Sequence, residues 1–421
     1  MAVNVHSSGM PRVGWKTLPL AALYDFKNGV NADRRAYGSG IPFINVLEPI
    51  TFSHICDRDI TGRVTLSDTT IAIYEVRVGD LVFNRTSEVL EEVGLAAAYL
   101  GKCCVVFGGF VIRARALGNA VDSKFAAYAL RAPKVRSQII AMGQGAVRAN
   151  IGQSNLRRVL IDIPPSAEQQ AIAAALSDAD TLIDSLEQLL TKKRQIKQGA
   201  IQELLTGQRR LPGFSGAWPE IRLGSIGRTF GGLTGKSKAD FGHGPARYIT
   251  FMNVMRNVTM NPDITESVNV LPTESQNRVQ VGDWLFNGSS ETPAEVALCS
   301  WVEACGSDVY LNSFCFGFRP NDPTAISGLF MAYFFRARPG RLAVSSLAQG
   351  ATRYNISKTA LLQVPLSLPR MNEQKAIAQV LSDMDTDIAA LEARLTKARD
   401  LKQAMAQALL TGRIRLLEPQ T

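Results

Sequence analysis

Two long stretches of the chain place apolar residues at alternating intervals of three and four. The first stretch runs from about residue 172 to 204 and the second from about 377 to 409. A 3.5-residue repeat sustained over several turns is typical of the apolar seam of a coiled coil. We therefore predict two long amphipathic helices whose seam consists of Ile172, Leu176, Ile183, Leu186 and Leu190 in the first, and Ile377, Leu381, Ile388, Leu391 and Leu395 in the second.

The residues that flank the two stretches predict where each helix starts and stops. Ser166 with Gln169 three residues later resembles a capping box, and Asn372 is the expected cap of the second helix. Gly207 and Gly412 follow the last apolar positions and favour helix termination.

The two stretches belong to a duplication with an offset of 205 residues. Residues 168–211 and 373–416 align without a gap, and 26 of the 44 positions are identical. So long a repeat is a duplicated domain with its helix and not a solenoid unit. Weaker matches continue upstream and pair residues 78–94 with 281–297, 143–151 with 348–356, 15–23 with 218–226, and "PFINV" (42–46) with "TFMNV" (250–254).

Charge along the helices predicts their relative direction. Each is acidic in its first half and basic in its second, so an antiparallel pair sets acid against base. We expect one antiparallel coiled coil, about 58 Å long for about 39 residues. The alternative is two amphipathic helices that each pack on their own domain. The predicted division is a first recognition domain at 1–165, spacer helices at 166–211 and 370–421, and a second recognition domain at 212–369.

The segments outside the helices predict an α+β fold in each half. Runs rich in β-branched and aromatic residues at 70–76, 80–85 and 102–115 alternate with glycine-rich turns and favour strands. Residues 123–142 and 326–347 favour helix in part. The expected fold class is thus two similar mixed α/β domains joined by a long antiparallel two-helix coiled coil.

Composition narrows the partners of the chain. A net charge of +9 and a pI near 9.3 suggest an acidic partner, commonly nucleic acid, although a merely basic soluble protein is an open alternative. No targeting segment or membrane span is visible, which predicts a cytoplasmic location. Six cysteines without a C-x-x-C pair and three histidines predict neither a metal site nor disulfides.

Two repeated loops gather residues suited to DNA. The first, in "NRTSE" and "NGSSE", contributes hydrogen-bonding groups for base edges or phosphates, or else a turn whose asparagines cap their own backbone. The second, in "QGAVRANI" and "QGATRYNI", places an arginine just before a helical stretch, where it suits a phosphate or an internal salt bridge. The candidates are Asn84, Arg85, Thr86, Ser87, Arg148 and Asn150 in the first half, and Asn287, Ser289, Ser290, Arg353 and Asn355 in the second.

Lysines in a loop of the second half complete the candidate set. Lys236 and Lys238 precede "TFMNV", although most surface charge is only solvated. The same loop contains "GGLTGKS" (231–237), which lacks the four-residue spacing of a phosphate-binding loop and makes an ATPase a weak hypothesis. No catalytic constellation is found, so we expect a protein that is not an enzyme and that holds no cofactor of its own.

The duplicated helix signature resembles that of a known family. Two copies of a variable domain that end in "IPPSAEQQAIAAALSDADTLIDSLEQLL" and "LPRMNEQKAIAQVLSDMDTDIAALEARL" are similar to the specificity subunit of type I restriction–modification enzymes over essentially the whole chain. The resemblance implies two target-recognition domains that each read half of a split double-stranded DNA site, and helices that form a spacer. It also implies two methyltransferase subunits and motor–nuclease subunits as partners, which carry S-adenosylmethionine, ATP and magnesium.

The resemblance gives the predicted function. The chain is expected to read an asymmetric bipartite DNA site and to direct adenine methylation and restriction by its partner subunits. One departure is that Gly288 stands where the first copy has Arg85, which argues against a shared DNA contact there. The alternative is a coiled-coil adaptor that gathers proteins and does not bind DNA.

Overall fold

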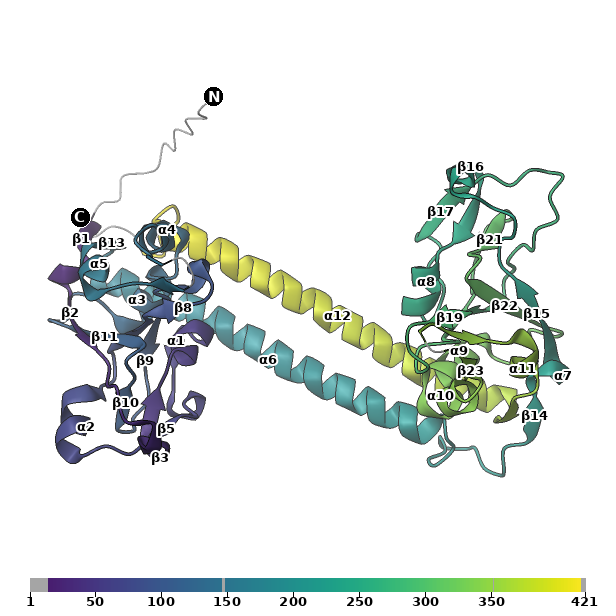
Figure 1. The fold of residues 1–421 in the computed structure, drawn as a ribbon, viewed down its shortest axis with the longest axis horizontal. Helices are drawn as coiled ribbons and strands as arrows, with labels where there is room; N and C mark the ends of the chain where they lie inside the picture. The colour runs from purple at the N-terminus through teal and green to yellow at the C-terminus, as the bar shows by residue number, and fades with distance from the viewer. Residues whose placement is uncertain (1–13, 146–147, 351, 418–421) are drawn as a thin grey trace. The chain divides into compact units, whose positions relative to one another are not determined.

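The computed structural model describes residues 14–145, 148–350 and 352–417. The chain forms two compact units, of which unit 1 contains residues 1–187 and 394–421 and unit 2 contains residues 188–393. Each unit mixes helices and sheets (Figure 1), which confirms the predicted α+β class. No helix in the described ranges is both long and apolar enough to cross a bilayer.

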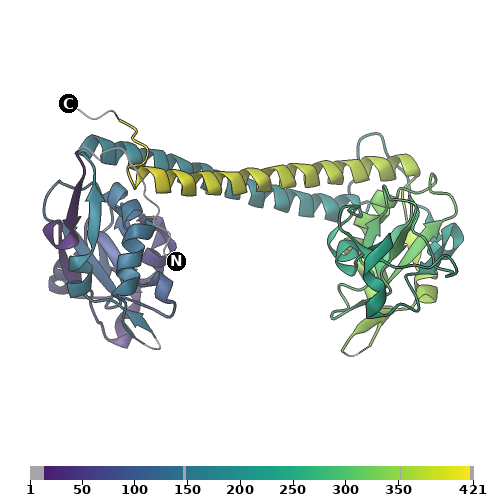
Figure 2. The same ribbon diagram turned by 90° about the horizontal axis from the view of Figure 1, so that it is seen from above.

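Two helices of equal length contribute to both units. They are α6 (Ser166–Leu204) and α12 (Met371–Leu409), each of 39 residues. We call residues 14–165, before α6, head 1, and residues 205–370, between the two helices, head 2. In Figure 2, which shows the ribbon from a second side, α6 and α12 lie next to one another in each unit.

The strands of head 1 form two main sheets and two small ones. The strands are β1 (Lys16–Pro19), β2 (Tyr24–Asn28), β3 (Tyr37–Ile44), β4 (His54–Ile55), β5 (Arg63–Val64), β6 (Glu75–Val76), β7 (Leu81–Asn84), β8 (Thr86–Ser87), β9 (Ala96–Tyr99), β10 (Val105–Phe107), β11 (Val111–Ala116), β12 (Ala149–Asn150) and β13 (Leu160–Ile163). The sheet orders are β2-β11-β7-β9-β4, β5-β3-β10-β6, β12-β8 and β1-β13. The helices are α1 (Leu47–Thr51), α2 (Asp68–Tyr74), α3 (Ser123–Ala129), α4 (Pro133–Ala141) and α5 (Gln153–Arg158).

Head 2 has a similar set of sheets, although in the described ranges its two main sheets contain four and three strands where those of head 1 contain five and four. Its strands are β14 (Glu220–Arg222), β15 (Gly227–Gly231), β16 (Phe241–Ile249), β17 (Thr265–Val268), β18 (Trp284–Asn287), β19 (Ser289–Ser290), β20 (Cys299–Trp301), β21 (Val309–Leu311), β22 (Cys315–Pro320), β23 (Ala348–Gln349), β24 (Tyr354–Ile356) and β25 (Pro365–Ser367). The orders are β15-β22-β18-β20, β17-β16-β21, β19-β24-β23 and β14-β25, so each sheet of head 1 has a counterpart. The helices are α7 (Leu223–Ile226), α8 (Phe251–Arg256), α9 (Gly328–Arg336), α10 (Arg338–Ser345) and α11 (Lys358–Leu362).

One expected strand is mostly a helix. Residues 70–76 were predicted as a strand from their β-branched side chains, but α2 occupies 68–74 and only β6 is extended. The Ser67 hydroxyl accepts a hydrogen bond from the amide of Thr70 and caps the helix. A local cap of this kind outweighs a weak strand propensity. The prediction was therefore wrong at this segment, whereas 80–85 and 102–115 contain β7, β10 and β11.

A second correction concerns the apparent match of "PFINV" with "TFMNV". Phe43 of β3 pairs with Val106, and Tyr248 of β16 pairs with Tyr310. Phe43 therefore corresponds in the fold to Tyr248, and not to the phenylalanine of "TFMNV". Residues 42–44 end β3, whereas 251–254 lie within α8. The sequence match is thus not a structural one, because two similar pentapeptides fall on different elements.

The helix ends agree only in part with the prediction. The carbonyl of Pro165 accepts the amide of Gln169 at 3.0 Å, while the Gln169 side chain donates to the carbonyl of Pro164 at 2.9 Å. The Ser166–Gln169 capping box is therefore wrong, and Asn372 lies inside α12 and is not its cap. The predicted stops are confirmed, since Gly207 (φ 72°) and Gly412 (φ 67°) adopt the left-handed conformation that favours glycine.

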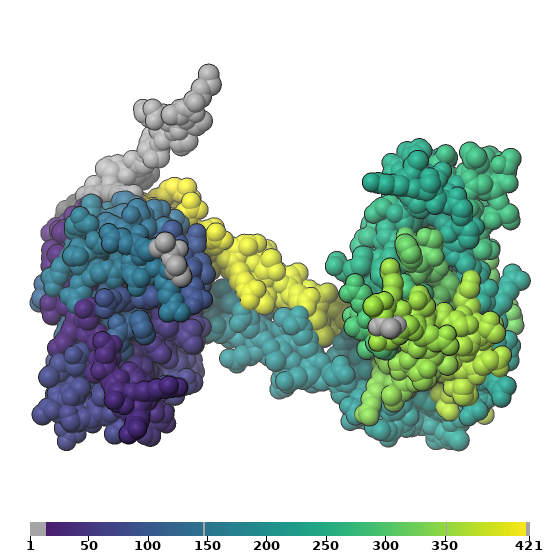
Figure 3. Space-filling model, in the orientation of Figure 1, coloured from purple at the N-terminus to yellow at the C-terminus, as the bar shows by residue number. Residues whose placement is uncertain are grey.

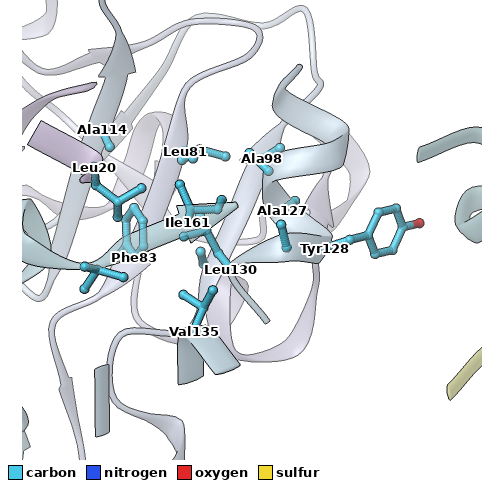
Figure 4. Packing of buried hydrophobic residues seen from close by; sticks show 14 of the residues in the cluster. Leu20, Leu81, Phe83, Ala98, Ala114, Ala127, Tyr128, Leu130, Val135 and Ile161 are labelled. Atoms are coloured by element: carbon cyan, nitrogen blue, oxygen red, sulfur yellow. The ribbon is translucent and has the colours of Figure 1, made fainter. Parts of the chain in front are cut away.

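The first turns of each long helix pack into the head that precedes it. Ile172 and Leu176 are fully buried in the core of head 1 together with residues such as Leu20 and Phe83. Figure 4 shows part of this core. Leu409, at the end of α12, joins the same cluster, and the end of α12 (yellow) lies against head 1 in Figure 3.

Unit 2 is built in the same way. Ile377 and Leu381 of α12 join the core of head 2, which also receives Leu204 from the end of α6. Each core is therefore completed by both helices. The predicted seam residues Leu186, Leu190, Leu391 and Leu395 are buried, and Ile183 and Ile388 are half-buried.

Ion pairs show that the helices run antiparallel in each unit. In unit 1, Arg399 binds Glu187 at 2.5 Å and Lys402 binds Asp180. In unit 2 the residues at the same offset repeat both contacts, with Arg194 on Glu392 at 2.6 Å and Lys197 on Asp385. The acid-against-base arrangement predicted from the charge pattern is confirmed within both units.

A buried ion pair ties the end of the chain to the start of α6 in unit 1. Arg415 donates to both carboxylate oxygens of Glu168 at 2.6 and 2.7 Å, and Glu168 is 2% exposed. We predict that Arg415→Ala lowers the free energy of unfolding by about 3 kcal/mol, because it leaves a buried carboxylate without its cation. Arg399→Ala, which removes an exposed pair, should cost less than about 1 kcal/mol. Urea unfolding of the full chain measures both, and equal losses would contradict the prediction.

Candidate nucleic-acid interface

The structure brings together the two loop motifs that sequence analysis left apart. Strand β8 pairs with β12, and the Thr86 hydroxyl donates to the side chain of Asn150 at 2.7 Å. In unit 2, β19 pairs with β24, so that Ser289 lies opposite Asn355. Each unit thus joins its "NRTSE" or "NGSSE" loop to its arginine loop through a short antiparallel ladder.

The two ends of each arginine loop pair with one another, and a short helix, α5 or α11, follows the loop as predicted. In unit 1, the backbones of Gln144 and Asn150 bond to each other at 2.9 and 2.7 Å. Gly145 (φ 126°) and Gly350 (φ 131°) begin the turns, where a Cβ atom would lie 2.1 Å from the carbonyl oxygen of Arg148 or Arg353. Only glycine fits such a close approach. Residues 146, 147 and 351 of these loops lie outside the described ranges.

The arginines of the turns are exposed. Arg148 donates to Glu88 at 3.1 Å, and the two side chains are 59% and 78% exposed. An exposed pair of this kind contributes at most about 1 kcal/mol, so a phosphate can compete for the guanidinium. Arg353 is also exposed, and its guanidinium carbon lies 5.3 Å from the centre of the Phe314 ring.

The remaining polar candidates of the turns are partly accessible. Asn150 and Asn355 are exposed, and each donates to the carbonyl of the arginine two residues before it. Arg85 and Thr86 are half-buried. The exposed or half-exposed candidates in the two units are therefore Arg85, Thr86, Arg148, Asn150, Arg353 and Asn355.

Of the two shared asparagines, Asn287 has a structural role instead. Asn84 and Asn287 are fully buried at the ends of β7 and β18. The Asn287 amide donates to the carbonyls of Ser289 and Glu295 at 3.1 and 2.8 Å, and its oxygen accepts the amide of Leu298 at 2.7 Å. These bonds hold the loop to its own strand, which is the alternative that the sequence left open. The structure offers neither side chain to a DNA duplex.

The shared serines are also turned inward. Ser87 and Ser290 are each 7% exposed and donate to Glu92 at 2.8 Å and Glu295 at 3.1 Å. Ser289 is 5% exposed. The proposed DNA surface therefore does not include these serines.

Of the two lysines, only one is accessible. The Lys236 amine lies 2.6 Å from the carbonyl of Asn269 and 2.6 Å from the carboxylate of Glu274, and its side chain is 5% exposed. This hydrogen bond contributes most to lowering the pKa of Glu274, to about 2. Lys236 thus closes an internal loop, whereas Lys238 is exposed.

A groove borders the arginine turn of unit 1. Its volume is about 530 Å³, and its lining includes Leu47, Thr86, Glu88, Phe110 and Arg148. Apolar and hydrogen-bonding groups therefore share one concave surface. Within the described ranges no cluster of histidine, cysteine and carboxylate side chains could hold a metal ion.

One repeated pattern that sequence analysis missed joins each head to its spacer helix. "AYALRAPKVR" (127–136) and "AYFFRARPGR" (332–341) share Ala-Tyr, two arginines and their spacing at the same offset of 205. The Tyr128 hydroxyl points away from the core in Figure 4 and donates to Asp180 of α6 at 2.7 Å, and Tyr333 donates to Asp385 of α12 at 2.6 Å. Burial, together with this hydrogen bond, raises the pKa of both tyrosines.

A sequence profile of the type I restriction modification DNA specificity domain matches the chain twice. The matched residues are 79–198 and 216–398, which is well over half of the chain and one match for each repeat. The chain belongs to the type I restriction–modification DNA specificity family. Its duplicated arginine turns are thus a feature of a DNA specificity protein.

Relatives of known annotation agree with this assignment to the specificity family. A Methanocaldococcus jannaschii protein, provisionally named as the type I restriction enzyme MjaX specificity subunit, is 25% identical over 96% of this chain and 94% of its own length. The type I restriction enzyme MjaVIII specificity subunit of the same organism is 22% identical over 76% of each chain.

Solved structures of the specificity family share the fold. The S subunit of a type I restriction–modification system from M. genitalium matches with a TM-score of 0.55 and 16% identity, over 97% of this chain and 98% of that one. The HsdS subunit from Thermoanaerobacter tengcongensis matches with a TM-score of 0.53 and 15% identity, over 96% and 98%.

Proposed function

We propose that this chain is the non-catalytic reader of one asymmetric, bipartite DNA site, and that it directs adenine methylation and restriction by partner subunits. Each unit reads one half of the site. The observation that carries the proposal is the exposed arginine turn that recurs in both units, with Arg148 in one and Arg353 in the other. A basic side chain on a turn suits a phosphate, and contacts of this type fix register on the duplex.

The differences between the units support an asymmetric site. Arg85 of unit 1 is replaced by Gly288 in unit 2, although both backbones occupy the same place beside β11 and β22. An arginine can bind guanine bidentately, whereas glycine has no side chain with which to read a base. Two readers with shared phosphate contacts and different base contacts select two different half-sequences.

The partners are proposed to be two methyltransferase subunits and motor–nuclease subunits. In unit 2, helix α6 carries two exposed apolar side chains seven residues apart, Leu189 and Ile196, which are 41% and 49% exposed. An apolar stripe at heptad spacing suits a partner helix. In this proposal S-adenosylmethionine, ATP and magnesium act in the partner subunits.

The deciding experiment maps methylated adenines in cells that express the full chain with the methyltransferase subunits of its source. One motif with two unlike half-sequences and a fixed gap is expected. A palindromic motif would exclude the asymmetric reading. Assembly with the methyltransferase subunits but no selective DNA binding would favour the adaptor function instead.

Replacement of the turn arginines should weaken binding to all duplexes alike. We predict that Arg148→Ala or Arg353→Ala lowers the slope of log K against log salt by about 0.9, because one phosphate contact is lost. Arg77→Ala is the matched control, since Arg77 is also an exposed arginine paired with a glutamate, Glu75, and precedes β7 at the end away from the turns. Fluorescence anisotropy at several salt concentrations measures the slope, and an unchanged slope would remove these arginines from the interface.

Arg85→Ala is expected to act differently from the turn arginines. Loss of a base contact in unit 1 should relax the sequence preference in one half-site by about 1–3 kcal/mol and leave the other half-site unaffected. Sequencing of duplexes selected from a random pool measures this preference. Equal relaxation of both half-sites would show that Arg85 does not read a base.

A further inference from the structure

An exposed phenylalanine stands at the same place in both units. Phe110 and Phe314 are each 57% exposed, and they are 204 residues apart in the sequence. A single exposed apolar side chain is ordinary on a protein surface, so the recurrence of the ring in both copies is informative only together with its surroundings.

The backbone holds each ring at a tight turn beside the polar loop. In unit 1 the amide of Val111 bonds to the carbonyl of Gly108 at 2.8 Å, and in unit 2 Cys315 bonds to Asn312 at 2.9 Å. The carbonyl of Phe110 accepts the amide of Arg85 at 2.7 Å, and that of Phe314 accepts the amide of Gly288 at 2.8 Å. Each phenylalanine is thus fixed next to the polar loop of its own unit, which in unit 1 carries the candidate base contact Arg85.

Each ring also lies beside the arginine of its own turn. Phe110 lines the same groove as Arg148 and Thr86 in unit 1. In unit 2 the Arg353 guanidinium covers one face of the Phe314 ring. An apolar ring beside an exposed cation matches the chemistry of a nucleic acid, which offers apolar base surfaces next to phosphates.

Duplicated exposure alone does not distinguish a contact residue. Val78 and Val281 are also exposed in both copies, at 64% and 59%. They precede β7 and β18, at the strand ends opposite to the polar loops. The valines therefore share the exposure of the phenylalanines but not their position beside the arginine turns.

We propose that Phe110 and Phe314 are direct DNA contacts, each packing its ring against a base step of one half-site while the neighbouring arginine binds a phosphate. This inference rests on the proposed function of the chain. Apolar side chains that press on a base step partly unstack it, and the apolar area that they bury offsets that cost. Because each ring belongs to one unit, each should affect one half-site.

The binding test uses the full chain assembled with its methyltransferase subunits. The probe is a fluorescein-labelled duplex selected from a random-sequence pool by the unmodified complex. Phe110→Ala and Phe314→Ala should each weaken binding roughly tenfold or more, a range typical for loss of one aromatic contact with a base. Val78→Ala and Val281→Ala are the matched controls and should bind as the unmodified complex does. Thermal melts should be unchanged in all four variants, since every side chain concerned is exposed.

A cross-linking experiment identifies what the ring touches. Photoactivatable benzoylphenylalanine replaces Phe110, Phe314 or, as control, Val78 in the same complex with the same duplex. Cross-links to DNA from positions 110 and 314, and none from 78, are expected. Cross-links from 110 and 314 to a methyltransferase subunit in place of DNA would overturn the proposal and make the rings a protein contact.

The outcomes separate this inference from the proposed function. If the unmodified complex binds its duplex selectively and both phenylalanine variants bind it equally well, the inference is overturned and the proposed function stays intact. Failure of the unmodified complex to select any duplex would overturn both. Weaker binding of the phenylalanine variants that the valine controls share would show a general effect of surface truncation and would also overturn the inference.

Discussion

A heptad inserted into both long helices is expected to abolish methylation of the original site. The insertions belong between Glu187 and Gln188 and between Ala393 and Arg394, where one unit ends and the other begins. All four duplicated ion pairs between α6 and α12 then keep their partners within each unit. If the helices set the gap, seven residues add about 10.5 Å, or about three base pairs. A half-site out of reach loses several base contacts, so methylation should fall by at least about 100-fold.

A longer insertion should restore activity at a new site. Three base pairs turn the duplex by about 100°, whereas one heptad turns a helix pair by only about 20°. Three heptads add about 31 Å, or about nine base pairs, which is close to one turn of DNA. The same two half-sequences should then be methylated with a gap about nine base pairs longer. A heptad inserted at 212–217 is the control and should leave the site unchanged. Methylation of the original site by the single-heptad chain would refute the spacer function.

Arg336→Ala is expected to unfold unit 2. The Arg336 guanidinium donates to the backbone carbonyls of Cys299, Met255, Val254 and Asn257 at 2.6–3.0 Å. Burial lowers the pKa of Arg336. Among the described residues, no other side chain donates a hydrogen bond to these four carbonyls. Carbonyls left without partners should cost about 4 kcal/mol or more together. Arg336→Lys should not restore stability, because one ammonium cannot reproduce a planar fork of donors.

The control for this substitution lies two residues away. Arg338 is exposed at the start of α10, and Arg338→Ala should change the free energy of unfolding by less than about 0.5 kcal/mol. Urea unfolding followed by circular dichroism measures both variants. Arg131→Ala should destabilise unit 1 in the same way, since Arg131 donates to the carbonyls of Ala96, Pro49 and Phe52. Wild-type stability of Arg336→Ala would show that the carbonyls find other donors.

Long periodic segments and duplicated charges were predictable from the sequence. The 3.5-residue pattern predicted both helices. Their antiparallel direction was predicted from charged residues such as Asp180, Glu187, Arg399 and Lys402, which form ion pairs in the structure. Both signals are local or repeat at a fixed offset, so they do not depend on knowing the tertiary fold. Leu176 shows the limit of this approach, because its side chain follows the seam pattern but packs into the core of head 1.

The candidate interface was predictable as residue types but not as geometry. The pairing of β8 with β12 joins loops more than 60 residues apart, which no periodicity reveals. Burial divided the candidates in a way that sequence could not, since Asn84 and Asn150 are equally polar but only Asn150 is exposed. The burial of Lys236 was missed for the same reason, because its partner Glu274 is 38 residues away. The phenylalanines beside the arginines were missed, since an isolated apolar residue in a sequence gives no sign of its exposure.

The contacts of Glu168 bring together two residues that are far apart in the sequence. In unit 1, Trp15 and Arg415 both donate to Glu168, although 400 residues separate them. In unit 2 Arg210 binds Glu373 and its guanidinium lies over the ring of the corresponding Trp218, and there a short continuous segment connects Arg210 with Trp218. A circular permutant that links Arg415 to Trp15 and begins near residue 213 should keep the contacts of Glu168 and Glu373 and reverse only the order in which the two readers are translated.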